Sequence, residues 1–183
     1  TESLALDYAR KLIACESITP ASGEVFDALQ MMLVPLGFTV ERFVAGEADD
    51  NPAHGAPVEN LFAIREAPGR HFAFAGHLDV VPPGEGWHSD PFVPEIRGEL
   101  LHGRGAVDMK GSIAAFVAAL HDIPADAGTI SLIITGDEEG PAIHGTRALI
   151  EHMQKRDSIP DACLVGEPTS VNRLGDMMKI GRR

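Results

Sequence analysis

The stretch TISLIIT, residues 129–135, decides the fold of this chain. Its run from Ile130 to Ile134 is short and almost uninterrupted in its apolar character, so a strand here would present apolar side chains on both faces. A strand buried on both faces is typical of a parallel sheet with helices packed on either side. The run therefore predicts a central strand of an α/β protein.

The segments around this run alternate between strand and helix patterns. We expect strands at residues 38–43, 60–65, 71–75 and 161–165, and helices at residues 4–14, 25–36, 110–121 and 146–154. Ser22 is the expected N-cap of the second helix. The order predicts a three-layer α/β sandwich with a mostly parallel central sheet. Residues 80–105 are longer than an ordinary loop, so they are either functional or a small hairpin excursion.

Bulk composition excludes several classes of protein. The chain has 183 residues and a formal net charge of −12, and its Lys and Arg residues together number 15, so no nucleic-acid partner is expected. The longest apolar run, residues 113–120, is far shorter than the ~20 residues that a membrane span requires. We expect one folded unit, soluble and cytoplasmic, without a membrane partner. Cys15 and Cys163 lack the spacing of a disulfide framework or a thiolate zinc site, and both are expected to be buried.

Acidic and imidazole side chains recur where the expected strands end. His77 follows one strand in AGHLD, Glu138 and Glu139 follow another in TGDEEG, and Glu167 follows a third in GEPTS, while Asp108 precedes a helix in GRGAVDMKG. Loops beyond the carboxyl ends of the strands are where α/β sheets bind ligands. A set of carboxylates and imidazoles in that place can hold two divalent cations over one water molecule. The pattern therefore predicts a two-metal hydrolase.

Three local patterns add detail to this prediction. His77 and Asp79 are two residues apart in extended chain and point to the same side, so the Asp79 carboxylate can accept the second N–H of the imidazole. Glycines around Asp108 let the backbone turn tightly, so one carboxylate can bridge two cations, whereas a phosphate-binding loop would end in G-K-[ST]. Glu138 and Glu139 are adjacent and cannot face the same way, so one is expected to bind metal and the other to act as general base. Each motif alone also fits a solvated turn or a helix cap.

The motifs GHLDVVPPG, GRGAVDMKG, DEEG and GEPT, taken in this order, resemble the di-zinc aminoacylase and carboxypeptidase superfamily. The resemblance implies two Zn²⁺ ions, with Co²⁺ or Mn²⁺ as alternatives. It implies that His77 and Glu167 bind one ion, that Glu139 binds the other and that Asp108 bridges them. Asp79 would orient His77.

The same resemblance assigns the remaining roles. Glu138 would be the general base and later the general acid, and the peptide bond between Asp108 and Met109 would be cis. Arg182, in the closing GRR, would contact a substrate carboxylate.

The last part of the chain, GEPTSVNRLGDMMKIGRR, resembles the branch of that superfamily that hydrolyses N-succinyl-LL-2,6-diaminopimelate to succinate and LL-2,6-diaminopimelate, in lysine and diaminopimelate biosynthesis. Members of the branch form homodimers through an inserted domain and then complete the catalytic sheet. We therefore expect residues 1–183 to be the N-terminal part of a catalytic domain, inactive alone, without the dimerisation domain and the C-terminal completion. The alternatives are a related deacylase such as acetylornithine deacetylase, a carboxypeptidase, or a non-catalytic metal-binding module.

Overall fold

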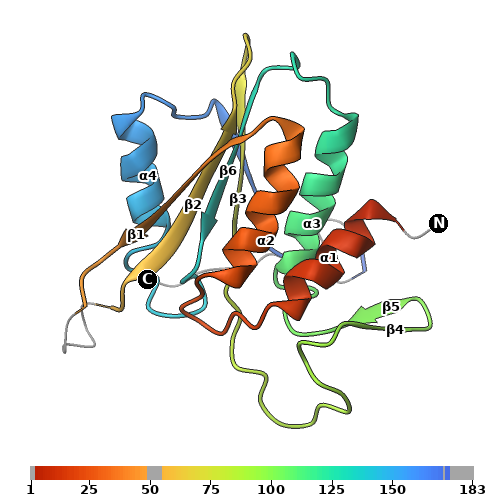
Figure 1. Cartoon of the computed structure of the whole chain (residues 1–183). Coiled ribbons are helices and arrows are strands. Elements are labelled where there is room, and N and C mark those ends of the chain that lie inside the picture. Colours follow the sequence, from red (N-terminus) through yellow and green to blue (C-terminus); the bar gives the residue numbers. More distant parts are fainter. Residues whose placement is uncertain (1–2, 49–54, 171, 174–183) are drawn as a thin grey trace.

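A five-stranded sheet with helices on both faces forms the body of the molecule (Figure 1). The computed structural model describes residues 3–48, 55–170 and 172–173. In chain order, the described elements are α1 (Leu4–Ala14), α2 (Glu24–Leu33), η1 (Val34–Leu36), β1 (Thr39–Ala45), β2 (Val58–Arg65), β3 (His71–His77), β4 (Glu95–Arg97), β5 (Leu100–His102), α3 (Lys110–Ala119), η3 (Leu120–Asp122), β6 (Thr129–Thr135), α4 (Thr146–Lys155) and β7 (Ala162–Val165).

The strands of the main sheet lie in the order β1-β2-β6-β3-β7. Strand β3 pairs in parallel with β6 and β7, whereas β2 is antiparallel to both β1 and β6. The predicted α/β architecture is confirmed, and the sheet is mixed because β2 runs against its neighbours. No described helix separates β1 from β2, and a parallel pair would need such a crossover.

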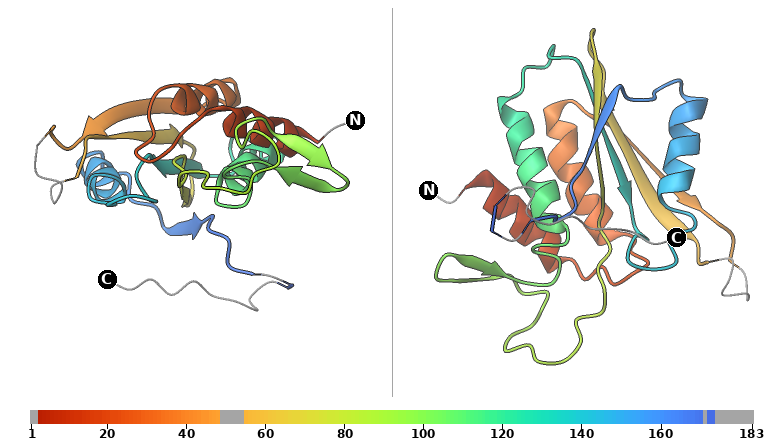
Figure 2. Two further views of the ribbon diagram at one scale, coloured as in Figure 1. Left: turned by 90° about the horizontal axis from the view of Figure 1, so that it is seen from below. Right: turned by 180° about the vertical axis from the view of Figure 1, so that it is seen from behind.

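The sheet separates two apolar cores. Figure 2 shows helices on either side of the sheet. Helices α1, α2 and α3 cover one face, where Leu132 and Ile134 of β6 are fully buried. Helix α4 covers the other face, where Ile133 packs with Leu149 and Met153. Neighbouring residues of β6 thus enter opposite cores, which is the burial that the apolar run predicted.

The boundaries of the other elements follow the sequence patterns closely. One helix cap and the burial of the cysteines differ from expectation. The N-cap of α2 is Gly23 rather than Ser22, and the Gly23 N–H donates to the Glu59 carboxylate at 2.7 Å. Neither cysteine is buried as expected: Cys15 is half-buried, and Cys163 is exposed because it lies on β7 at the edge of the sheet. Within residues 80–105, β4 and β5 pair as a two-stranded ribbon, so this segment contains the hairpin excursion.

None of the described helices has the length and apolar character that crossing a membrane would take.

Candidate metal centre

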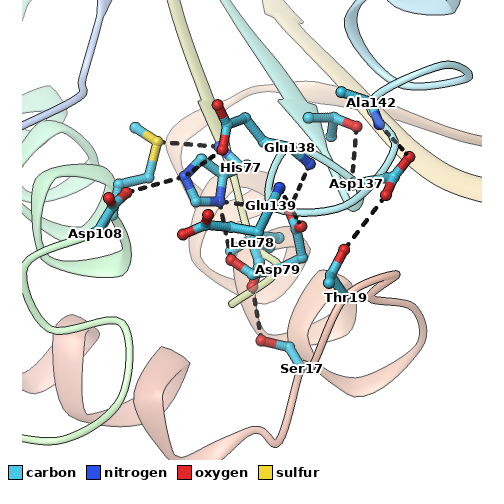
Figure 3. Close-up of polar contacts among 12 residues, drawn as sticks. Ser17, Thr19, His77, Leu78, Asp79, Asp108, Asp137, Glu138, Glu139 and Ala142 are labelled. Atoms are coloured by element: carbon cyan, nitrogen blue, oxygen red, sulfur yellow. Dashed lines mark hydrogen bonds and ion pairs between the residues drawn. The ribbon is translucent and has the colours of Figure 1, made fainter. Parts of the chain in front are cut away.

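The five predicted side chains meet at the carboxyl ends of β3, β6 and β7. Figure 3 shows His77, Asp108, Glu138 and Glu139 together. His77 is the last residue of β3, and its Nε2 lies 3.1 Å from Asp108 Oδ1, 3.2 Å from Glu167 Oε1 and 3.8 Å from Glu138 Oε2. Parallel β3, β6 and β7 end at the same edge of the sheet, which brings together residues that lie up to 90 positions apart in the sequence.

The ligand atoms fall into two overlapping groups that share His77. One group contains Asp108 and Glu139, the other contains Glu138 and Glu167, and the ligand atoms of each group lie within 4.8 Å of one another. Both adjacent glutamates therefore reach the same imidazole. They belong to different groups, and the chain that carries them bends at residues 138–140, so the division into one ligand and one base stays a prediction.

Hydrogen bonding fixes the orientation of the His77 ring. Its Nδ1 lies 2.9 Å from the Asp79 backbone oxygen and 3.4 Å from the Asp79 carboxylate. A carbonyl oxygen can only accept, so Nδ1 carries a proton and donates it, and Nε2 is left facing the acids. The nearest partner is thus the carbonyl of Asp79 and not the predicted carboxylate, which instead accepts the N–H groups of Glu138 at 3.1 Å and Glu139 at 2.9 Å.

Negative charge dominates the site. Burial opposes a charge on His77, but the hydrogen bonds and charge of Asp79 and the charge of Glu138 outweigh it and raise the pKa of His77 to about 9. Burial and neighbouring carboxylates also raise the pKa of Glu138 and of Glu139. Carboxylate oxygens and an imidazole nitrogen crowded in this way fit divalent zinc, cobalt or manganese, which would supply the missing positive charge.

An apolar-walled cavity of about 430 Å³ opens beside these ligands. His77, Glu138 and Glu167 line one part of it, and Ile150 of α4 and Val165 of β7 line another. A linear substrate could therefore lie against the sheet with its reacting bond at the acidic cluster.

Several supporting residues carried no signal in the sequence. Lys110 is fully buried, and its ammonium group donates to the Cys15 backbone oxygen at 2.9 Å. Burial lowers the pKa of Lys110 to about 8. Met109 accepts the His77 N–H through its sulfur at 3.2 Å, and the bond between Asp108 and Met109 is cis, as the resemblance implies. Their partners lie far away in the sequence, so local patterns could not reveal them.

Asp137 and Thr19 were also missed. Asp137 is 2% exposed and directly precedes the two glutamates in TGDEEG, so its position next to that pair is the signal that could have found it. Arg182, the predicted substrate contact, lies outside the described residues.

The family model for peptidase family M20/M25/M40 matches residues 73–180, which is more than half of the chain. The chain belongs to this family. The match begins in β3 and takes in all five side chains of the acidic cluster.

Curated members of the M20/M25/M40 family include very similar proteins. A succinyl-diaminopimelate desuccinylase of Erythrobacter litoralis is 69% identical over 183 residues, covering 99% of this chain and 48% of that protein. One of Novosphingobium aromaticivorans is 71% identical over 177 residues, covering 96% of this chain and 46% of that protein. The chain spans about half the length of the curated relatives it matches. Among solved structures, human carnosine dipeptidase 1 matches with a TM-score of 0.69 and 25% identity, covering 91% of this chain and 38% of that one.

Metal affinity should fall as the pH is lowered. Below pH 9 the metal-free His77 holds a proton on Nε2, and an ion that binds this nitrogen must displace it. Each unit below pH 9 should therefore weaken binding about tenfold through this group, or roughly a hundredfold between pH 8 and pH 6. Titration of metal-free full-length protein with Zn²⁺ at these two pH values measures the change. Equal affinities at both would mean that His77 is not a ligand.

Proposed function

We propose that the whole protein is a metal-dependent amidohydrolase that converts N-succinyl-LL-2,6-diaminopimelate and water to succinate and LL-2,6-diaminopimelate. The observation that carries the proposal is the cluster of four acids around the His77 imidazole. The names of relatives that are 69% and 71% identical support the choice of substrate. This reaction belongs to lysine and diaminopimelate biosynthesis and would take place in the cytoplasm.

The ligand roles follow from the donor atoms. His77 and Glu167 would hold one divalent cation, Glu139 the other, and Asp108 would bridge them, with zinc as the expected metal and cobalt or manganese as alternatives. Bound there, the cations would polarise the amide carbonyl and lower the pKa of the attacking water. Asp79 keeps the His77 ring oriented through its carbonyl oxygen.

Glu138 is the proposed general base. Its side chain is 49% exposed, so water and substrate can reach it, and burial together with nearby acids raises its pKa toward the working pH. The Glu138 carboxylate would take a proton from the attacking water and return it to the nitrogen as the amide C–N bond breaks. Succinate and the free amine are then released.

Substrate orientation would come from two places. The cavity beside Glu138 has apolar walls that suit the methylene groups of a linear substrate. Arg182 is proposed to bind a substrate carboxylate, since a guanidinium can donate two parallel hydrogen bonds to it.

The chain is proposed to be the N-terminal part of a catalytic domain that further chain completes, in a protein that forms a homodimer. Relatives about twice as long support this division. Strand β7 is the last of the sheet, and Leu164 and Val165 on its opposite faces are 50% and 59% exposed. Covering such side chains would remove apolar area from water.

Substrate choice can be tested with the full-length protein. We expect succinate release from N-succinyl-LL-2,6-diaminopimelate with a kcat/KM at least a hundredfold above that for deacetylation of N-acetylornithine. A rate measured in the same buffer and with the same metal makes the comparison direct. A preference for N-acetylornithine would favour the related deacylase instead.

Replacing Glu138 by Gln should lower kcat by about 10²–10⁴-fold, because the amide cannot accept the proton. Metal content should stay near that of the wild type, whereas Glu139→Gln should lose metal together with activity. Turnover assays combined with elemental analysis measure both quantities. The exposed Glu151→Gln on α4 is the matched control and should behave as the wild type. Loss of metal in Glu138→Gln would make Glu138 a ligand.

Residues 1–183 expressed alone should release no measurable succinate. They lack the further chain that is proposed to complete the catalytic domain, and they leave the apolar side chains of β7 uncovered. Succinate release at the rate of the full-length protein would contradict the proposed division of the catalytic domain.

A further inference from the structure

Behind the metal ligands lies a buried polar network that joins three segments of the chain (Figure 3). It contains the carboxylates of Asp79 and Asp137, which are 0% and 2% exposed, and the hydroxyl of Thr19. Thr19 lies between α1 and α2, Asp79 lies just after β3, and Asp137 lies just after β6. None of the three is a proposed ligand or the proposed base.

The two carboxylates hold the loop that carries the catalytic glutamates. Asp79 accepts the N–H groups of Glu138 and Glu139 at 3.1 and 2.9 Å, and Asp137 accepts the N–H of Ala142 at 3.0 Å. The position of Glu138 therefore depends on where these two buried carboxylates are fixed.

Thr19 contacts one of these carboxylates directly. Its hydroxyl donates to Asp137 Oδ1 at 3.3 Å. Hydrogen bonds to carboxylates are among the stronger ones, so this contact helps to hold Asp137 where it accepts the Ala142 N–H.

The backbone holds the Thr19 hydroxyl in place. Thr19 N–H donates to the Val80 oxygen at 3.0 Å, and Ala21 N–H donates to the Gly136 oxygen at 2.7 Å. Gly140 packs directly on the network, since a Cβ at this position would lie 2.2 Å from Asp137 Oδ1 and 2.9 Å from Thr19 Oγ1. The loop that carries the glutamates is thus packed against Thr19 and Asp137 too closely to accept a side chain at position 140.

We propose that Thr19 is a positioning residue for the reaction, whose hydroxyl donates to Asp137 and so fixes the loop that places Glu138. The proposal rests on the role proposed for Glu138 as general base. Thr19 touches neither substrate nor metal, so its loss should slow turnover and leave both bound.

The test compares Thr19→Val, which keeps the shape and removes the hydroxyl, with Thr19→Ser, which keeps the hydroxyl, in the full-length metal-loaded protein. Thr19→Val should lower kcat about tenfold while KM and metal content change less than twofold. Thr19→Ser should keep at least half of kcat. Thr39→Val at the exposed start of β1 is the matched control.

A second variant separates positioning from a general structural role. In a Glu138→Gln background, Thr19→Val should lower the residual rate less than twofold, because the group that it positions is already absent. A further tenfold loss there, a wild-type kcat in Thr19→Val, or an equal loss in Thr19→Ser would overturn the proposal.

Amide hydrogen exchange gives a readout that does not depend on the substrate. The N–H groups of Glu138, Glu139 and Ala142 should exchange at least tenfold faster in Thr19→Val than in the wild type or Thr19→Ser. Unchanged exchange would contradict the proposal even in a protein with no desuccinylase activity. A wild type that fails to release succinate would instead contradict the proposed function alone.

Discussion

The buried carboxylate of Asp79 joins the end of β3 to the loop after β6. The two carboxylate oxygens accept hydrogen bonds from the N–H groups of Glu138 and Glu139. The backbone oxygen of Asp79 accepts a hydrogen bond from His77 Nδ1. Because β3 and β6 are adjacent and parallel, their ends are already close, and this one residue sets the imidazole against the two glutamates. The geometry of the remaining site, including the neighbouring Asp108, depends on that connection.

This arrangement crowds negative charge, which is unfavourable by itself but attracts a proton or a cation to the site. Acids from three segments converge on His77 Nε2, and the pKa of His77 is raised to about 9 despite its burial. A proton and a divalent cation are alternative ways to neutralise such a cluster. Thr19 donates to Asp137, and Asp137 accepts the Ala142 N–H of the loop that carries the two glutamates, so we infer that this network helps to hold them in place.

Much of the fold could be predicted from periodicity alone. Residues 129–135 were predicted as β6 to the residue, because a short, almost uninterrupted apolar run between polar residues is typical of a buried strand. The direction of β2 could not be predicted, since side-chain alternation is the same in parallel and antiparallel strands. Ser22 was a plausible cap, but the N-cap is Gly23, whose N–H donates to Glu59 of a distant strand.

The candidate site shows the same division between local and distant information. Residues such as His77 and Glu167 were predicted because they follow strands whose ends meet, whereas Thr19 contacts Asp137 across 118 positions and leaves no local pattern.

The central claim is that the acidic cluster is a two-metal centre. Anomalous X-ray diffraction at the zinc edge from crystals of the zinc-loaded full-length protein tests it most directly. We predict two peaks about 3.5–4 Å apart, both next to Asp108 and with His77 bound to one of them. A single peak, or none at this cluster, would contradict the account.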